Sequence, residues 1–149
     1  MLPIDFNREK FIADIREKHS AILPADIDFY VEDGWLPVVA DGLQQIQDFI
    51  EKNRWLHKAH VRQIKEKFGE LRIYVRPRYE EHQFSDELAT NLATVRDNIS
   101  RVSRHTCEVC GDPGELDVIA GYHQTLCGYH ADRRKAWISH GRPDEEWRK

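Results

Sequence analysis

Two short motifs near the end of the chain constrain it more than any other feature. Cys107 and Cys110 are separated by two residues, and Cys127 and His130 repeat that spacing further along. A tight turn can bring two thiolates at this spacing to one side of a tetrahedral ion, and thiolate and imidazole groups are the donors that zinc prefers. The pattern therefore predicts one zinc ion held by these four side chains.

The segments around the ligands predict a treble-clef arrangement. Residues 131–139 have helical character, so Cys127 and His130 would project from one face at the start of that helix. Between the two ligand pairs, short runs with strand character flank Gly121 and Tyr122, which predicts a hairpin. A knuckle, a hairpin and a ligand-bearing helix, in that order, favour a treble clef over a ββα finger. Four protein ligands fill the coordination shell, so we expect the zinc to be structural.

Other interpretations of these cysteines and histidines are weaker. His105 and His123 could replace His130 as the fourth ligand. A cysteine pair at this spacing also occurs in redox dithiols, and a lone cysteine is ordinarily a small buried hydrophobe. Neither of these alternatives explains why the spacing recurs. A reducing cytosol discourages disulfides, and the number of cysteines, three, is odd.

Composition indicates a globular chain with an uneven charge. Hydrophobic residues make up 40% of the 149 residues and charged residues 32%. No stretch approaches the roughly 20 apolar residues that cross a bilayer, and the N-terminus lacks a secretory pattern, so we expect a cytoplasmic protein without membrane contact. Residues 1–53 carry 5 basic against 11 acidic side chains, which disfavours a broad basic nucleic-acid surface but allows a local basic strip.

The expected fold is α+β, with helices packed on a small antiparallel β-hairpin sheet. We expect an α+β body over residues 1–104, a zinc-binding module over 105–140 and a tail over 141–149. Apolar residues recur at three- and four-residue intervals in three helices, about 5–22, 37–53 and 85–104. Their expected buried stripes are Phe11, Ile12, Ile15, His19 and Ile22; Leu36, Val39, Leu43, Ile46 and Ile50; and Leu88, Leu92, Val95, Ile99 and Val102.

Local signals define the ends of these elements. Asp5 or Asn7 can cap the first helix, and Ser85 can cap the third. Apolar and polar residues alternate from Leu71 to Arg76, which predicts a strand, and residues 61–65 could form its partner. Together they predict a hairpin over about 60–76 with Gly69 in its loop. The acidic segment 26–33 is predicted to be a loop or a short edge strand.

Several motifs together resemble a group of small bacterial and phage proteins. The group shares a helix led by Gly-Trp (here Gly34 and Trp35) and a Lys-Glu-Lys-Phe-Gly hairpin (residues 65–69). Cys-x-x-Cys-Gly and Leu-Cys-x-x-His follow, so the resemblance covers residues 34–130 and leaves out 1–33. Accessory-gene families of this kind include immunity proteins for antibacterial effectors. The resemblance therefore implies a non-catalytic protein that neutralises a cognate toxin.

A nuclease toxin would suit an acidic inhibitor surface. Such a toxin holds phosphate in a basic groove, so an acidic partner gains affinity and a fast association rate. Aromatic side chains next to the acids could anchor the contact. We expect this surface to comprise Asp26, Asp28, Phe29, Tyr30, Glu32, Asp33 and Trp35. The same residues could equally be a solvated loop around core aromatics.

Two further function classes stay open. A nucleic-acid-binding face could form from Arg62, Arg72, Tyr74 and Arg76, because basic groups interleaved with an aromatic ring can track a backbone and stack a base. These residues could also be the wet face of a half-buried hairpin. Treble clefs also carry His-Asn-His-type nucleases, but His123 has no neighbouring His or Asp doublet. We therefore expect no catalytic residue and no small-molecule substrate.

Overall fold

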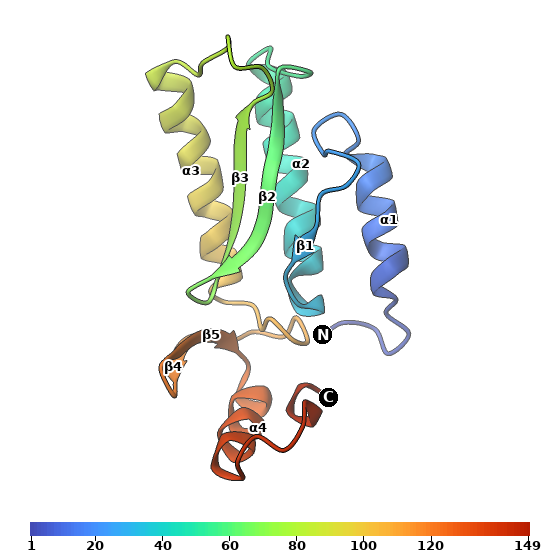
Figure 1. Cartoon of the computed structure of the whole chain (residues 1–149), viewed down its shortest axis with the longest axis vertical. Helices are drawn as coiled ribbons and strands as arrows, with labels where there is room; N and C mark the ends of the chain where they lie inside the picture. Colours follow the sequence, from blue (N-terminus) through green and yellow to red (C-terminus); the bar gives the residue numbers. More distant parts are fainter.

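The computed structural model describes residues 1–149 as a helix-and-sheet body with a smaller C-terminal module beneath it (Figure 1). The predicted α+β class is confirmed. None of the helices is both long and apolar enough to cross a membrane. The elements are α1 (Arg8–Lys18), β1 (Phe29–Tyr30), the 3-10 helix η1 (Asp33–Trp35), α2 (Leu36–Lys52), β2 (Ala59–Lys67), β3 (Glu70–Pro77), α3 (Asp86–Ser103), β4 (Glu115–Ile119), β5 (Tyr122–Leu126), α4 (Gly128–Ser139) and the 3-10 helix η2 (Glu146–Arg148).

The body contains a three-stranded sheet in the order β1-β2-β3. Strands β2 and β3 form the predicted antiparallel hairpin, with Ile64 opposite Ile73. The acidic segment supplies an edge strand, because β1 pairs with β2 in parallel and places Phe29 opposite Ile64. The predicted antiparallel hairpin thus gains one short parallel strand at its edge, within the segment that was predicted to be a loop or a short edge strand. Burial of Phe29, which is 7% exposed, explains why this short strand pairs.

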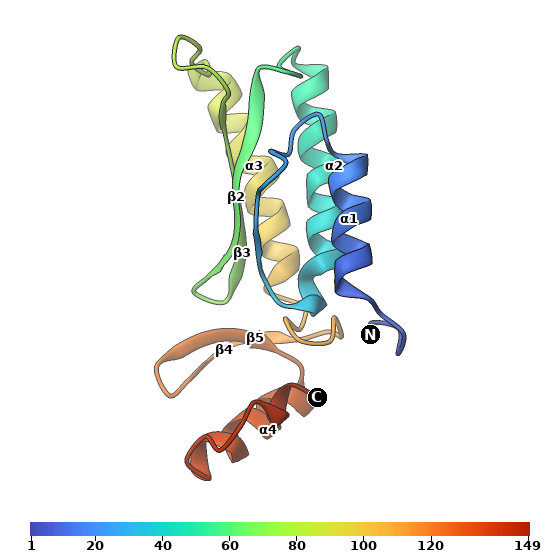
Figure 2. The ribbon, with the colours of Figure 1, turned by 45° about the vertical axis from the view of Figure 1, so that its right-hand side comes forward.

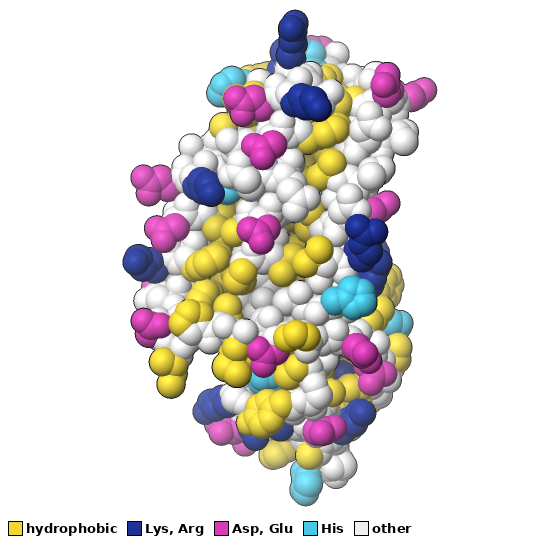
Figure 3. All heavy atoms as spheres, turned by 180° about the vertical axis from the view of Figure 1, so that it is seen from behind, with side chains coloured by type: hydrophobic (Ala, Val, Ile, Leu, Met, Phe, Trp, Pro, Cys, Tyr) yellow, Lys and Arg dark blue, Asp and Glu magenta, His cyan; other side chains and the backbone are white.

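Helices α1, α2 and α3 all lie on one side of this sheet (Figure 2). Burial alternates along β3, where Leu71, Ile73 and Val75 face the helices and Arg72 and Tyr74 face away. From behind, hydrophobic side chains gather in the middle of the visible surface, and charged side chains are scattered around them (Figure 3). The opposite face of the sheet carries no helix, and we call it the open sheet face.

Two of the predicted caps close their helices. The Lys10 amide donates to the Asn7 side chain (3.0 Å), and the Leu88 amide donates to Ser85 (3.1 Å). Helix α1 covers only Arg8–Lys18 of the predicted 5–22, since the chain turns after His19 while Ile22 stays buried.

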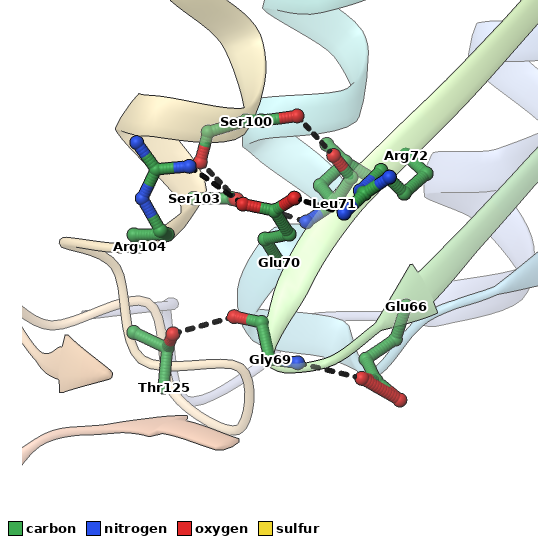
Figure 4. A network of polar contacts seen from close by, with 9 residues as sticks. All are labelled: Glu66, Gly69, Glu70, Leu71, Arg72, Ser100, Ser103, Arg104 and Thr125. Carbon is green, nitrogen blue, oxygen red and sulfur yellow. Dashed lines mark hydrogen bonds and ion pairs between the residues drawn. The ribbon is translucent and has the colours of Figure 1, made fainter. Parts of the chain in front are cut away.

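The predicted stripe of α2 is fully confirmed, but that of α3 needs one correction. All five stripe positions of α2 are buried. In α3, Val102 is 50% exposed, and Ser100 and Ser103 face the sheet instead. Ser100 donates to the Leu71 carbonyl (2.7 Å) and the Leu71 amide donates to Ser103 (2.9 Å). These bonds fasten α3 to the edge of β3, as Figure 4 shows.

Candidate metal centre

The four predicted ligands converge. Their donor atoms, the sulfurs of Cys107, Cys110 and Cys127 and a ring nitrogen of His130, all lie within 4.8 Å of one another. His130 Nδ1 is 3.7 Å from the Cys107 sulfur and 3.3 Å from the Cys127 sulfur, and the Cys110 and Cys127 sulfurs are 3.8 Å apart. None of the cysteines is in a disulfide. This cluster could hold one metal ion.

A tight turn supplies the first two ligands. The Gly111 amide donates to the Cys107 carbonyl (3.0 Å), which closes the turn around Cys110. Gly111 has a φ of 82°, a conformation that costs glycine little and other residues more. The turn is pinned by the Cys107 amide, which donates to the Asp112 carbonyl (2.7 Å). This is the predicted knuckle.

The hairpin and α4 supply the other two ligands. Ala120 and Gly121 connect β4 to β5 with φ of 52° and 82°, the positive values that a tight two-residue hairpin turn needs. Cys127 then caps α4, and the His130 amide donates to its sulfur (3.5 Å). The predicted order of knuckle, hairpin and helix is therefore present. Cys127 therefore lies at the N-terminal end of α4, where the positive end of the helix dipole is located.

In the absence of a metal, burial shifts the pKa values of several of the candidate ligands. Cys107, Cys127 and His130 are all under 9% exposed. Burial raises the pKa of the Cys107 thiol, raises that of Cys110 to about 12, and lowers that of the His130 imidazole. Buried groups favour their neutral forms, so thiolates at this site need a compensating cation.

The Gly-Trp pair at the start of α2 holds the knuckle against the body. The Gly34 amide donates to the Glu108 carbonyl (2.8 Å), and Trp35 Nε1 donates to the Thr106 carbonyl (2.8 Å). A Cβ atom on Gly34 would lie 2.2 Å from the Cys107 carbonyl oxygen, so no larger residue fits without movement. This contact explains in physical terms why glycine and tryptophan stand here.

The tip of the β2–β3 hairpin holds the other side of the module. Thr125, on β5, donates to the Gly69 carbonyl (2.7 Å), and the Gly69 amide donates to Glu66 (2.9 Å), as Figure 4 shows. The neighbouring Glu70 carboxylate pairs with Arg72 and Arg104. The Lys-Glu-Lys-Phe-Gly loop is therefore part of the interface between the body and the candidate metal centre.

The alternative fourth ligands lie outside the cluster. His105 and His123 are both exposed, and neither belongs to the group of converging donors. The ring of His123 instead packs edge-on against Phe68, with ring centroids 5.7 Å apart.

The expected acidic partner surface is only partly exposed. Phe29 is 7% exposed and Trp35 is 0% exposed, so the expectation that they anchor a partner is wrong. Both belong to the core of the body, because their large apolar surfaces are buried under the helices. The exposed members of the surface are Asp26, Asp28 and Tyr30.

Two of the acids already have partners within the chain. Glu32 pairs with Arg148 and Asp33 pairs with Arg8. These ion pairs tie the segment after β1 to η2 and to α1. Asp26 and Asp28 form no ion pair, although the Tyr30 hydroxyl donates to Asp28 (2.9 Å).

The basic residues of the hairpin lie on the open sheet face. The Tyr74 ring lies between the Lys65 ammonium and the Arg76 guanidinium, at 5.5 and 5.8 Å. Arg72 is neutralised by Glu70, and Arg62 sits at a bulge in β2, beside the acidic edge of the sheet.

Sequence reasoning missed a buried carboxylate next to the metal ligands. Glu108 is 3% exposed and accepts a hydrogen bond from the Thr125 amide (2.7 Å). Burial raises the pKa of Glu108 to about 8. Only the position of Glu108 inside the knuckle motif could have drawn attention to it, since an acid between ligands is usually exposed.

Comparison with protein-family models, with curated proteins and with solved structures finds no match to this chain.

Proposed function

We propose that the four ligands hold one structural zinc ion. With a Zn–S bond of about 2.3 Å, the edges of a regular tetrahedron are about 3.8 Å long. The Cys110 and Cys127 sulfurs are 3.8 Å apart, which supports this geometry. Three thiolates and one imidazole form a closed shell, so a bound zinc would have no position for an activated water. The ion would stabilise the fold, and the chain would have no metal-dependent catalysis.

We further propose that the chain is a binding protein that neutralises a cognate protein, a toxin of the nuclease class. The observation that carries this proposal is the charge pattern of the open sheet face. Tyr30 on β1 lies beside Lys65 on β2, and Lys65 lies opposite Arg72 on β3. Asp28, two residues before Tyr30, points to the same side because successive strand residues alternate.

The open sheet face thus runs from an acidic edge at β1 to an edge at β3 where Arg76 is the unpaired cation, because Arg72 pairs with Glu70. Asp26, Asp28, Tyr30 and Arg62 share one surface cavity of about 520 Å³ along the acidic edge. A surface with both signs of charge and exposed aromatic rings suits a protein partner with the opposite pattern. A phosphate backbone would be attracted by one edge and repelled by the other.

Affinity for the toxin tests this function. The tagged chain would be used to isolate its partner from the cells that produce it, and the purified partner would be assayed for nuclease activity. We expect the chain to inhibit that activity and Asp26→Lys with Asp28→Lys to weaken binding at least about tenfold. The matched control is Asp41→Lys with Glu51→Lys on α2, two exposed acids on the helical side. Undiminished binding by the first variant would reject the acidic edge as the docking surface.

Nucleic-acid binding is the second candidate, favoured by the position of Tyr74 between two cations. The Tyr74 ring is half-buried, and a ring flanked by positive charge can stack a base on its open side while the cations contact phosphate. Fluorescence anisotropy with a single-stranded oligonucleotide would test it, between about 50 and 200 mM salt. This candidate requires a steep loss of affinity with salt and a further loss in Arg62→Gln with Arg76→Gln. Weak binding that does not depend on salt would exclude it.

A further inference from the structure

A second cavity lies between the end of β2, β5, α4 and η2. Its volume is about 260 Å³. Residues from β2, from β5, from α4 and from the C-terminal tail line it. They are Glu66, Tyr122, His123, Gln124, Arg134, Trp137, Arg142, Trp147 and Arg148.

Three buried donors around this cavity have no acceptor in the chain. They are Nη1 of Arg134 and the indole Nε1 atoms of Trp137 and Trp147. Arg134 is only 5% exposed, and its one hydrogen bond runs from Nη2 to the Ile119 carbonyl (3.3 Å). Indole and guanidinium nitrogens donate but cannot accept. The lining also holds one buried unpaired acceptor, Gln124 Oε1, but an amide oxygen has two lone pairs and cannot pair all three donors. Since buried donors are normally paired, the set calls for a further acceptor from outside the chain.

The cavity is also positively charged. Neither Arg134 nor Arg142 forms an ion pair, whereas Arg148 pairs with Glu32 and Glu145. Burial lowers the pKa of the Arg134 guanidinium, as do Arg148 and Arg142, while Glu108 opposes that change.

Aromatic rings lie against these cations. The Arg142 guanidinium lies 5.9 Å from the Trp137 ring, and Arg134 lies 6.0 Å from the Trp147 ring. Such contacts fix the direction in which each guanidinium points. One carboxylate of the lining, Glu66, counters part of this charge, and it already accepts a hydrogen bond from the Gly69 amide.

We propose that this cavity binds the phosphate group of a small phosphorylated ligand. A phosphate presents several strong acceptor oxygens and up to two negative charges, which match the unpaired donors and the two unpaired arginines. The arginine fork suits bidentate contact with phosphate better than a single point charge would. Tyr122, which is 64% exposed, lies at the cavity and offers a ring for a planar group attached to the phosphate.

This site is independent of the proposed partner surface. No residue of the cavity is shared with the acidic edge of the open sheet face or with the four candidate zinc ligands. Failure of phosphate binding would therefore leave the proposal of a protein partner intact, and the reverse also holds.

Indole N–H signals in nuclear magnetic resonance spectra test the site directly. The chain has four tryptophans, and Trp35 serves as an internal reference because its indole already donates to Thr106 (2.8 Å). The zinc-loaded protein would be titrated with inorganic phosphate, and separately with adenosine 5′-monophosphate, at constant ionic strength set with sodium chloride. We expect the Trp137 and Trp147 signals to shift saturably and the Trp35 signal to stay unchanged. Tighter binding of the nucleotide would identify a nucleotide site, and equal affinities a site for free phosphate.

Two charge-matched variants complete the test. Arg142→Gln should weaken binding of both probes at least about tenfold, because it removes an unpaired guanidinium. Lys135→Gln removes one positive charge from an exposed position of α4 and should bind as the unmodified chain does. The proposal is overturned if neither probe shifts the two indole signals below about 10 mM. Equal shifts with sodium chloride alone, or equal weakening by both variants, would also overturn it.

Discussion

Gly34 and Cys107 are in contact although they are 73 positions apart in the sequence, and a Cβ atom at Gly34 would lie 2.2 Å from the Cys107 carbonyl oxygen. The start of α2 is therefore built against the knuckle that carries two of the candidate metal ligands. We expect folding of the body and assembly of the candidate metal centre to be coupled through this contact.

Replacing Gly34 with alanine should damage both parts of the protein. The added methyl group meets backbone atoms that cannot rotate away, so we expect a loss of about 2–3 kcal/mol in the free energy of unfolding. Denaturant unfolding and the bound zinc per chain would measure the effect. Gly128→Ala is the matched control, because nothing lies within 4 Å of its Cβ position. Equal stabilities of the two variants would disprove the coupling.

Thr125→Val should weaken the contact between the hairpin tip and the metal module. Valine keeps the shape of threonine but leaves the Gly69 carbonyl without the donor at 2.7 Å. Since Thr125 is fully buried, the unpaired carbonyl should cost about 1–3 kcal/mol. Thr94→Val, at an exposed position of α3, should change the free energy of unfolding by less than about 0.5 kcal/mol. Similar losses in both variants would contradict the assigned role of Thr125.

His60 should make the fold less stable in mild acid. Burial, and then Arg78 and Arg62, lower the pKa of His60 below its usual 6.5. The unfolded chain therefore takes up the proton first, and stability should fall as pH drops below about 6.5 and level off below the folded-state pKa. Urea unfolding between about pH 5 and 7.5 would measure the difference between the unmodified chain and His60→Gln. Relative to the unmodified chain, the free energy of unfolding of His60→Gln should increase as the pH is lowered. A difference between the two proteins that does not change with pH would contradict the role assigned to His60.

Metal removal should unfold the C-terminal module before the body. The body has a hydrophobic cluster of 20 buried residues, whereas the module has only 5, among them Cys107 and Cys127. Structural zinc contributes about 10 kcal/mol to the folding of small zinc-binding peptides. In hydrogen exchange after chelation, we expect residues 105–140 to lose protection while α2 and β2 retain theirs. Uniform protection throughout the chain would contradict this order.

The metal centre and the helices were the predictable parts of this fold, because each has a local signal. The spacing of Cys107, Cys110, Cys127 and His130 depends on the geometry of a turn and a helix start. In the same way, the apolar period of α2 follows from one buried helix face.

Features that depend on distant partners could not be read in advance. Strand β1 has two residues, too few for a period, and its partner Ile64 is far along the chain. In the sequence, Trp35 and Phe29 could each be a core residue or a surface anchor. The two roles differ only in burial, which depends on how the helices pack over these rings. Val102 continues the apolar period of α3, but Ser100 donates to the Leu71 carbonyl and Ser103 accepts from the Leu71 amide. These two hydrogen bonds determine which face of α3 meets the sheet.

The sequence likewise did not predict whether the tail, residues 141–149, folds back onto the chain or contacts a partner. Trp147 is 3% exposed and packs against Trp137, with ring centroids 6.1 Å apart. The tail therefore folds back onto α4, an arrangement that depends on contacts between its aromatic and basic side chains.

Native mass spectrometry of the purified chain, with its metal content, tests the central claim most directly. We predict one zinc ion per chain in the unmodified protein and none retained in Cys110→Ser. A metal-free chain with its complete fold, or a variant that keeps its zinc, would contradict the proposed structural centre.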